Sequence, residues 1–120
     1  MLFTIKNLNP ISQYQYLSKN KRFVSKRGKE WSNEFCNQIK KQMNEYKPIL
    51  SENIEVHILF IFDNKRSNDL DNACKYVLDK LSDCDCIKDD RYITKLVLEK
   101  TYNKLSEDRM IISIIDRDII

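Results

Sequence analysis

The strongest constraint on the fold is a change of hydrophobic period near the middle of the chain. From Ile54 to Phe62 apolar side chains alternate along one face of a strand, and Leu59 and Ile61 make part of the other face apolar as well. From Asp69 to Ser82 the apolar residues recur instead with the i, i+3, i+4, i+7 spacing of an amphipathic helix. The chain is therefore predicted to run from a central strand into a helix.

The remaining predicted elements are a strand, a polar loop, a brief extended piece, a helix and two further β-rich runs. They span Leu2 to Lys6, Asn7 to Asn20, Arg22 to Ser25, Lys26 to Tyr46, Tyr92 to Thr101 and Met110 to Asp116. Because a polar connection joins the last two runs, we expect them to pair as a hairpin. Helices interleaved with strands predict an α/β fold of mixed α+β type, in which a small mixed β-sheet packs with two main helices.

The composition points to one domain inside the cell. The chain has 120 residues with one glycine and two prolines, so it offers no flexible linker, and we expect a single domain over residues 1–120. No apolar run approaches the ~20 residues of a membrane-spanning helix, and Met1 to Asn9 lacks the features of a secretion signal. The four cysteines are too few for a disulfide scaffold, so we expect all of them to be reduced. Cys84 and Cys86 form a C-x-C pair, which is a metal-binding alternative without a second pair to complete it. We therefore expect a cytoplasmic protein with no membrane partner.

Positive charge is concentrated in the first half of the chain. Residues 1–50 hold ten Lys or Arg against three Asp or Glu, whereas residues 51–120 hold eleven against fifteen. Six of the basic residues fall in one stretch with no acidic residue among them: Lys19, Lys21, Arg22, Lys26, Arg27 and Lys29. Such a stretch is typical of a surface that binds phosphate groups. The alternative is a solvated charged face without a ligand.

A group of acidic residues lies where the central strand meets its helix. Asp69 stands at the helix boundary and Asp71 in the first turn, so their carboxylates can converge, while Lys75 and Asp79 continue the same polar ridge. Open α/β sheets commonly bind ligands at such crossings. The alternative is helix capping, since a carboxylate there also favours the positive end of the helix dipole.

Further carboxylates precede the next predicted strand. Asp89 and Asp90 have no evident capping role, and clustered acids repel one another without a cation. Carboxylate oxygens from separate positions suit Mg²⁺ or Mn²⁺. Asp63 to Lys65 form a D-x-K motif, which is an alternative metal-binding pattern but lacks an upstream acidic partner. The lone His57 has no nucleophile or metal ligand beside it in the sequence pattern.

Together these motifs resemble those of a known family. Asp69-Leu70-Asp71-Asn72 with Lys75, Asp79 and Asp89-Asp90 resembles the core motif of the RusA family of Holliday-junction resolvases, including the distance between its two parts. The N-terminal region is also similar to that family, through Pro10, Ser12, Arg22, Ser25-Lys26, Gly28, Lys29 and Trp31. The resemblance covers most of the chain, and the acidic motif is its more specific part.

The resemblance implies an enzyme with a RusA-like fold, a crossover junction endodeoxyribonuclease of DNA recombination and repair. It implies that Asp69, Asp71 and Asp90 bind a divalent metal, Mg²⁺ or Mn²⁺, and that Lys75 is the catalytic lysine. Members of the family are homodimers whose two active sites cut opposing strands of a four-way DNA junction. The basic stretch would then hold the DNA backbone without reading bases.

The chain departs from the family pattern at two places. Gln13 and Tyr14 stand where members usually have Asn, and Asn68 stands where a basic residue often precedes the first aspartate. These changes leave the expected metal ligands intact and affect junction selectivity. Lys75 has a structural alternative, an i, i+4 ion pair with Asp71. Two other functions fit the same residues, namely a non-catalytic protein that binds branched DNA and a nuclease that acts on forks or flaps.

Overall fold

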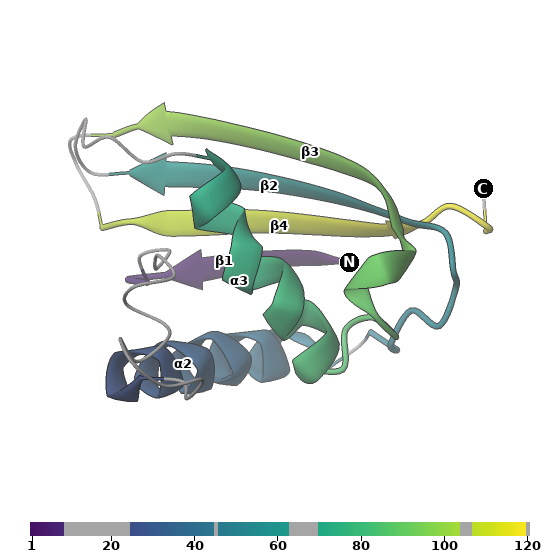
Figure 1. The fold of residues 1–120 in the computed structure, drawn as a ribbon, viewed down its shortest axis with the longest axis horizontal. Coiled ribbons are helices and arrows are strands. Elements are labelled where there is room, and N and C mark those ends of the chain that lie inside the picture. Colours follow the sequence, from purple (N-terminus) through teal and green to yellow (C-terminus); the bar gives the residue numbers. More distant parts are fainter. Residues whose placement is uncertain (9–24, 45, 63–69, 104–106, 120) are drawn as a thin grey trace.

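The computed structural model describes residues 1–8, 25–44, 46–62, 70–103 and 107–119. Its elements are β1 (Leu2–Lys6), α2 (Lys26–Gln42), β2 (Ile54–Phe62), α3 (Leu70–Asp83), the short 3₁₀ helix η1 (Asp90–Tyr92), β3 (Ile93–Tyr102) and β4 (Arg109–Asp116). The strands form one mixed sheet in the order β1-β4-β2-β3, with α3 crossing the sheet and α2 beside β1 (Figure 1). The predicted mixed sheet with two main helices is confirmed. Most of the expected polar loop, the extended piece before α2 and the D-x-K motif lie outside the described residues.

The central strand is the one that the hydrophobic pattern predicts. β2 pairs with β4 in antiparallel orientation and with β3 in parallel orientation. The expected hairpin between the last two strands is therefore wrong, because β2 lies between them. A parallel pair needs a long crossover connection, and α3 provides it between β2 and β3. No helix among the described residues is long and apolar enough to cross a membrane.

The core lies between the sheet and its helices. Along β2 every even-numbered residue is buried and every odd-numbered one is partly exposed, so one face of the strand points into the core. The largest fully buried side chains come from three strands, β1, β2 and β4, and from both helices: Phe3, Ile5, Phe35, Ile39, Ile54, Val56, Ile58, Phe60, Leu81, Met110, Ile112 and Ile114. Burial of one such side chain stabilises the fold by about 1.5–3 kcal/mol.

Helix α2 begins where the sequence predicts and ends one turn earlier. The Ser25 side chain caps the helix by accepting a hydrogen bond from the Gly28 amide at 3.0 Å. The helix ends at Gln42, and the Met43 amide donates to the Lys40 carbonyl at 3.3 Å in a tighter turn. The expected end at Tyr46 is wrong because the chain turns from Met43 onward, where the Tyr46 amide bonds to the Met43 carbonyl.

Two glutamines of α2 close the β1 edge of the sheet. The Gln42 amide group bonds both backbone groups of Thr4, accepting from N–H at 2.9 Å and donating to C=O at 2.8 Å. Gln38 does the same at Lys6, with both bonds at 2.7 Å. Four helix residues rise about 6 Å and two strand residues about 6.6 Å, so the two spacings match. The glutamine side chains thus take the place of a neighbouring strand.

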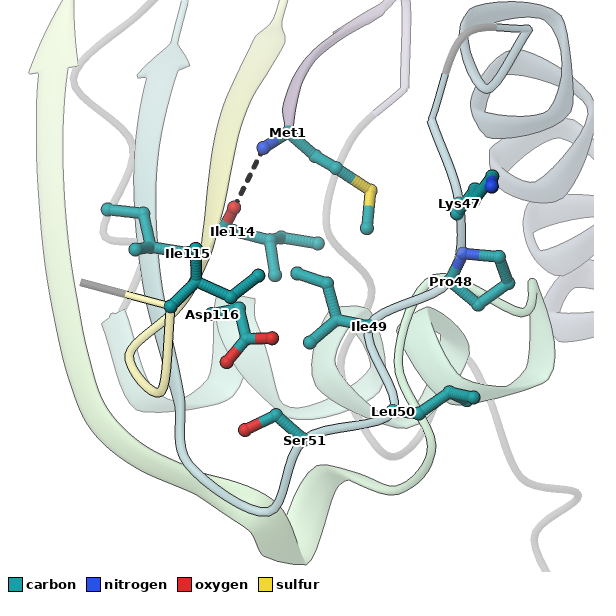
Figure 2. A pocket seen from close by; sticks show the side chains of 10 residues that line it. Met1, Lys47, Pro48, Ile49, Leu50, Ser51, Ile114, Ile115 and Asp116 are labelled. Atoms are coloured by element: carbon teal, nitrogen blue, oxygen red, sulfur yellow. Dashed lines mark hydrogen bonds between the residues drawn. The ribbon is translucent and has the colours of Figure 1, made fainter.

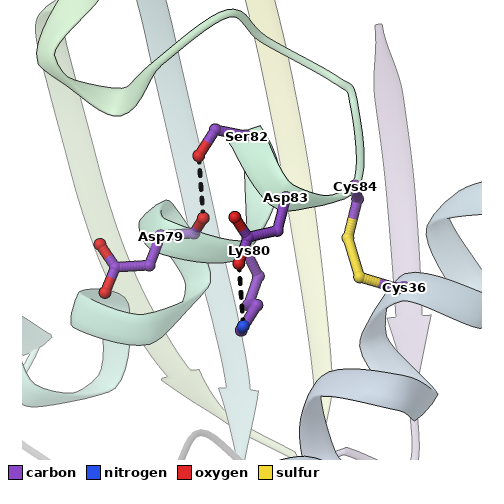
Figure 3. Close-up of a disulfide and its surroundings, with 6 residues drawn as sticks. All are labelled: Cys36, Asp79, Lys80, Ser82, Asp83 and Cys84. Atoms are coloured by element: carbon purple, nitrogen blue, oxygen red, sulfur yellow. Dashed lines mark hydrogen bonds and ion pairs between the residues drawn. A yellow bond between two sulfur atoms is a disulfide. The ribbon is translucent and has the colours of Figure 1, made fainter.

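The cysteines contradict the expectation that all four are reduced. Cys36 of α2 and Cys84, just after α3, form a disulfide with Cα atoms 5.5 Å apart (Figure 3). Cys74 and Cys86 are free and buried. Cys84 is therefore unavailable for a C-x-C metal site, and burial raises the pKa of the Cys86 thiol to about 12. Patterns of residue type do not reveal that α2 and α3 approach each other at these two points.

Candidate active site

The polar ridge of α3 forms as the sequence predicts. Ala73, Cys74 and Val77 face the core, whereas Asp71 and Lys75 are exposed in the first two turns. Asp71 lies in the first turn, where the helix dipole favours a negative charge. Asp69, the expected partner of Asp71, lies outside the described residues.

Asp90 lies at the other end of α3. It begins η1, which packs against α3 ahead of β3, and its side chain is half-buried. Burial raises the pKa of the Asp90 carboxyl above its usual value, and the hydrogen bonds that its protonated form donates to Asp89 and Asp79, together with the negative charges of those two residues, raise it further. Asp79 is therefore the residue of α3 that meets Asp90. The sequence places Asp79 on the ridge, but only the packing of η1 on α3 shows this contact.

Asp89 differs from Asp90 in its surroundings. Its side chain caps η1 by accepting a hydrogen bond from the Arg91 amide at 2.9 Å, so the expectation that this pair has no capping role is wrong for Asp89. The same bond is the main cause that holds the pKa of Asp89 below its usual value against the effect of burial, and the hydrogen bond with Asp90 and the charge of Arg91 lower it further. The Arg91 guanidinium also lies 3.7 Å from the Asp89 carboxylate. One acid of the pair is thus stabilised as an anion and the other is not.

The carboxylates expected to bind metal are spread along α3 in a single chain. Asp71 and Asp79 are eight residues apart, which is about 12 Å along a helix axis. Figure 1 shows η1 near the end of α3 that is remote from its first turn. Within the described ranges, no group of three His, Cys, Asp or Glu side chains is close enough to hold a metal ion. Asp69 lies outside those ranges, so the three-aspartate set itself stays a prediction.

Lys75 lies one turn after Asp71 and one turn before Asp79. Its ammonium group is 6.0 Å from the centre of the Tyr76 ring, and in the described part of α3 no ion pair joins it to Asp71. The structural alternative of an i, i+4 pair is therefore not formed. Lys80, further along the helix, does form an ion pair, of the i, i+3 kind, with Asp83 at 2.9 Å (Figure 3).

Half of the basic stretch lies at the N-terminus of α2. Lys26, Arg27 and Lys29 are exposed there, and the first turn carries no acidic residue. The other three residues, Lys19, Lys21 and Arg22, lie outside the described ranges. Cations at a helix N-terminus oppose the helix dipole, which favours anions at that end. The arrangement costs stability in the free protein and suits a bound phosphate.

His57 and an apolar pocket beside Met1 play no part in this arrangement. His57 is hydrogen-bonded to Glu55 on the face of the sheet away from the core, as a structural histidine would be. This pocket, one of those formed by the described residues, has a volume of about 690 Å³ and is lined mainly by aliphatic side chains, including Met1, Ile49 and Ile114 (Figure 2). It lies at the end of β4 and lacks the convergent carboxylates that hydrolysis of DNA would use.

The comparison with protein families agrees with the motifs. Residues 8–115 match the family model of the endodeoxyribonuclease RusA, which covers nearly the whole chain. The chain is a nuclease that hydrolyses DNA. It belongs to the RusA family, the endodeoxyribonucleases that resolve Holliday junctions. No curated protein matches the chain.

Proposed function

We propose that this protein resolves four-way DNA junctions by paired, symmetric cleavage that depends on Mg²⁺, with Mn²⁺ as a substitute. The observation that carries the proposal is family membership over residues 8–115, together with the exposed Asp71 and Lys75 at the start of α3. We further propose that residues 1–120 act as one domain and as a homodimer. The activity would serve recombination and repair in the cytoplasm of a bacterium or a phage-infected cell.

Asp69, Asp71 and Asp90 are the proposed metal ligands. Their carboxylate oxygens are the donors that Mg²⁺ prefers, and Mg²⁺ is usually held by one or two carboxylates with substrate phosphate. A bound Mg²⁺ would neutralise the phosphate and lower the pKa of water. Asp90 is half-buried beside Asp79, where a cation would relieve the repulsion between the two carboxylates. The donor chemistry therefore fits the ion.

Lys75 is the proposed catalytic lysine. Its exposed ammonium group lies one helical turn from Asp71 and is not neutralised by it. A fixed positive charge at this point would stabilise the negative charge that develops on the phosphate oxygens during hydrolysis. Lys26, Arg27 and Lys29, with Lys19, Lys21 and Arg22, would hold the DNA backbone through its phosphates.

The test uses a synthetic four-way junction with labelled strands. We expect the wild type to nick opposing strands with Mg²⁺ and to bind without cutting when EDTA is present. Asp71→Asn and Asp90→Asn should abolish cutting and keep binding, because each substitution removes a carboxylate charge that repels phosphate. Lys75→Ala should lower the rate about 10²–10³-fold. Asp83→Asn, an exposed acid of the same helix, is the matched control and should cut normally.

Asp79→Asn adds a second comparison. If Asp90 acts with Asp71, the Asp79→Asn variant should still cut the junction. If Asp79→Asn and Asp90→Asn lose the same amount of cutting activity, Asp79 belongs to the site as well. Wild-type protein that binds the junction but never nicks it with Mg²⁺ or Mn²⁺ would refute the nuclease proposal in favour of a binding protein. If the protein cleaves forks or flaps faster than four-way junctions, the preferred substrate is the fork or flap and not the junction.

A further inference from the structure

The two edges of the sheet differ. The β1 edge is closed by Gln38 and Gln42, which bond the outward backbone groups of Thr4 and Lys6. The β3 edge spans ten residues, and among the described strands it pairs with β2 alone. Figure 1 shows β3 as the outermost strand, opposite β1. An open edge of this length is a template for pairing with another strand.

The backbone of β3 has a definite polarity. The Asn103 amide donates to the Phe62 carbonyl of β2 at 2.8 Å. Because backbone groups point to alternate sides along a strand, the odd-numbered residues of β3 turn their N–H and C=O groups toward β2. The even-numbered residues, Leu96 and Leu98 among them, turn theirs toward the open edge. An antiparallel partner strand must therefore pair even residues with even residues.

This condition and the charges of β3 select one register between two copies. Two antiparallel copies of β3 are related by a two-fold axis that passes through one residue of the strand. If that residue is Lys95, Glu99 or Lys100, its charge lies opposite the same charge of the other copy. If it is Leu96 or Leu98, no opposite charges of the two strands are paired. Centring on Val97 sets Lys95 opposite Glu99 of the other copy, twice, and Leu96 opposite Leu98. Opposite charges directly across a strand pair stabilise it, and like charges destabilise it.

The side chains also fit this register on the helix face. Leu96 is 40% exposed in the single chain, and Leu98 is half-buried at the margin of the core. Two copies centred on Val97 would bring these four leucines together and extend the core past the edge. The pairs of Lys95 and Glu99 would lie on the opposite face.

We propose that a second copy of this chain pairs with β3 in antiparallel orientation, with Val97 on the two-fold axis. The two sheets then form one continuous sheet. Because the β1 edge is closed, this contact joins two copies and stops, whereas two open edges would permit filaments. The proposal rests on the homodimer of the proposed function and identifies its interface.

Charge exchange tests the register in the full-length protein without DNA or metal. Lys95→Glu and Glu99→Lys should each raise the dimer dissociation constant about tenfold, because each sets like charges together at two places. The double variant Lys95→Glu/Glu99→Lys should restore dimerisation, although Lys95 also lies 3.9 Å from Glu55 within its own chain. Lys40→Glu on α2 makes the same charge change away from β3 and should have no effect. Sedimentation equilibrium gives the dimer dissociation constant of the wild type and of the four variants.

A cross-link provides the second readout. Val97 would meet its own counterpart at a pair without backbone hydrogen bonds, where Cα atoms are about 4.5 Å apart, within the range of a disulfide. Val97→Cys should therefore give covalent dimers on mild oxidation by a small disulfide such as oxidised glutathione. Thr101→Cys, on the same face of β3, should not, because its counterpart would be about 26 Å away.

The outcomes separate this interface from the nuclease function. A wild type that stays monomeric, or a dimer that withstands both single charge changes and does not cross-link at position 97, would overturn the β3 interface. Junction cleavage by such a protein would leave the proposed activity standing. Conversely, a β3 dimer that never cuts DNA would support the interface and refute the activity.

Discussion

At the scale of single residues, Asp85 shows how α3 is stopped. It has a φ of 61°, in the left-handed region that favours glycine. The Cys86 amide bonds to the Leu81 carbonyl at 3.0 Å and the Asp85 amide to the Ser82 carbonyl at 3.1 Å, which together form a Schellman motif. This termination sets the direction in which the chain leaves for η1 and so positions Asp90.

Asp85→Gly should stabilise the protein by about 1 kcal/mol, because glycine adopts this conformation without the steric cost of a side chain. Urea denaturation followed by circular dichroism measures the effect. Asp83→Gly, inside the last turn of the helix, is the control and should destabilise by about 0.5–1 kcal/mol. Loss of stability in the Asp85 variant would show that its carboxylate contributes more than the backbone geometry.

At the scale of elements, the basic residues in the first turn of α2 lower the stability of the helix in the free protein. Three exposed cations stand at its N-terminus, while Lys40 and Lys41 stand at its C-terminus, where the dipole favours them. The sequence alone locates the basic residues and the start of the helix. Together these two predictions already place Lys26, Arg27 and Lys29 at the helix end, and the structure adds the Ser25 side chain that caps this end.

Arg27→Glu should stabilise the free protein by about 0.3–1 kcal/mol and weaken junction binding. The slope of log affinity against log salt should fall by about one. Lys41→Glu is the matched control at the other end of α2, where the same charge change should destabilise the helix and leave the salt slope unchanged. Fluorescence anisotropy at several salt concentrations measures the slope. An unchanged slope in the Arg27 variant would remove this helix end from the DNA surface.

At the scale of the whole molecule, local periodicity predicts most elements and fails on their pairing. The alternation in β2 and the apolar stripe of α3 depend on near neighbours in the chain, so the sequence reveals both. The partner of β3 depends on the right-handed crossover through α3, and a polar connection suggests a hairpin instead. The same limit applies to the site, where the sequence names the aspartates but not the meeting of Asp79 with Asp90. The bond between Cys36 and Cys84 likewise depends on how α2 packs beside α3.

Removing that disulfide should lower the free energy of unfolding. The two cysteines are 48 residues apart, and constraining a loop of that length in the unfolded chain corresponds to about 4 kcal/mol. Urea denaturation with and without a phosphine reductant measures the difference. Cys36→Ser/Cys84→Ser is the control, since the reductant should no longer affect it. Equal midpoints for oxidised and reduced wild type would contradict the bond.

The position of this disulfide has a mechanical consequence. Cys36 belongs to α2, whose basic N-terminus is proposed to bind DNA. Cys84 directly follows α3, which carries the proposed catalytic residues Asp71 and Lys75. When the disulfide is formed, α2 and the end of α3 are cross-linked directly. When it is reduced, only side-chain packing holds the two helices together. If the proposed roles of the two helices hold, reduction of this bond would therefore let the DNA-binding end of one helix move more freely relative to the catalytic residues of the other.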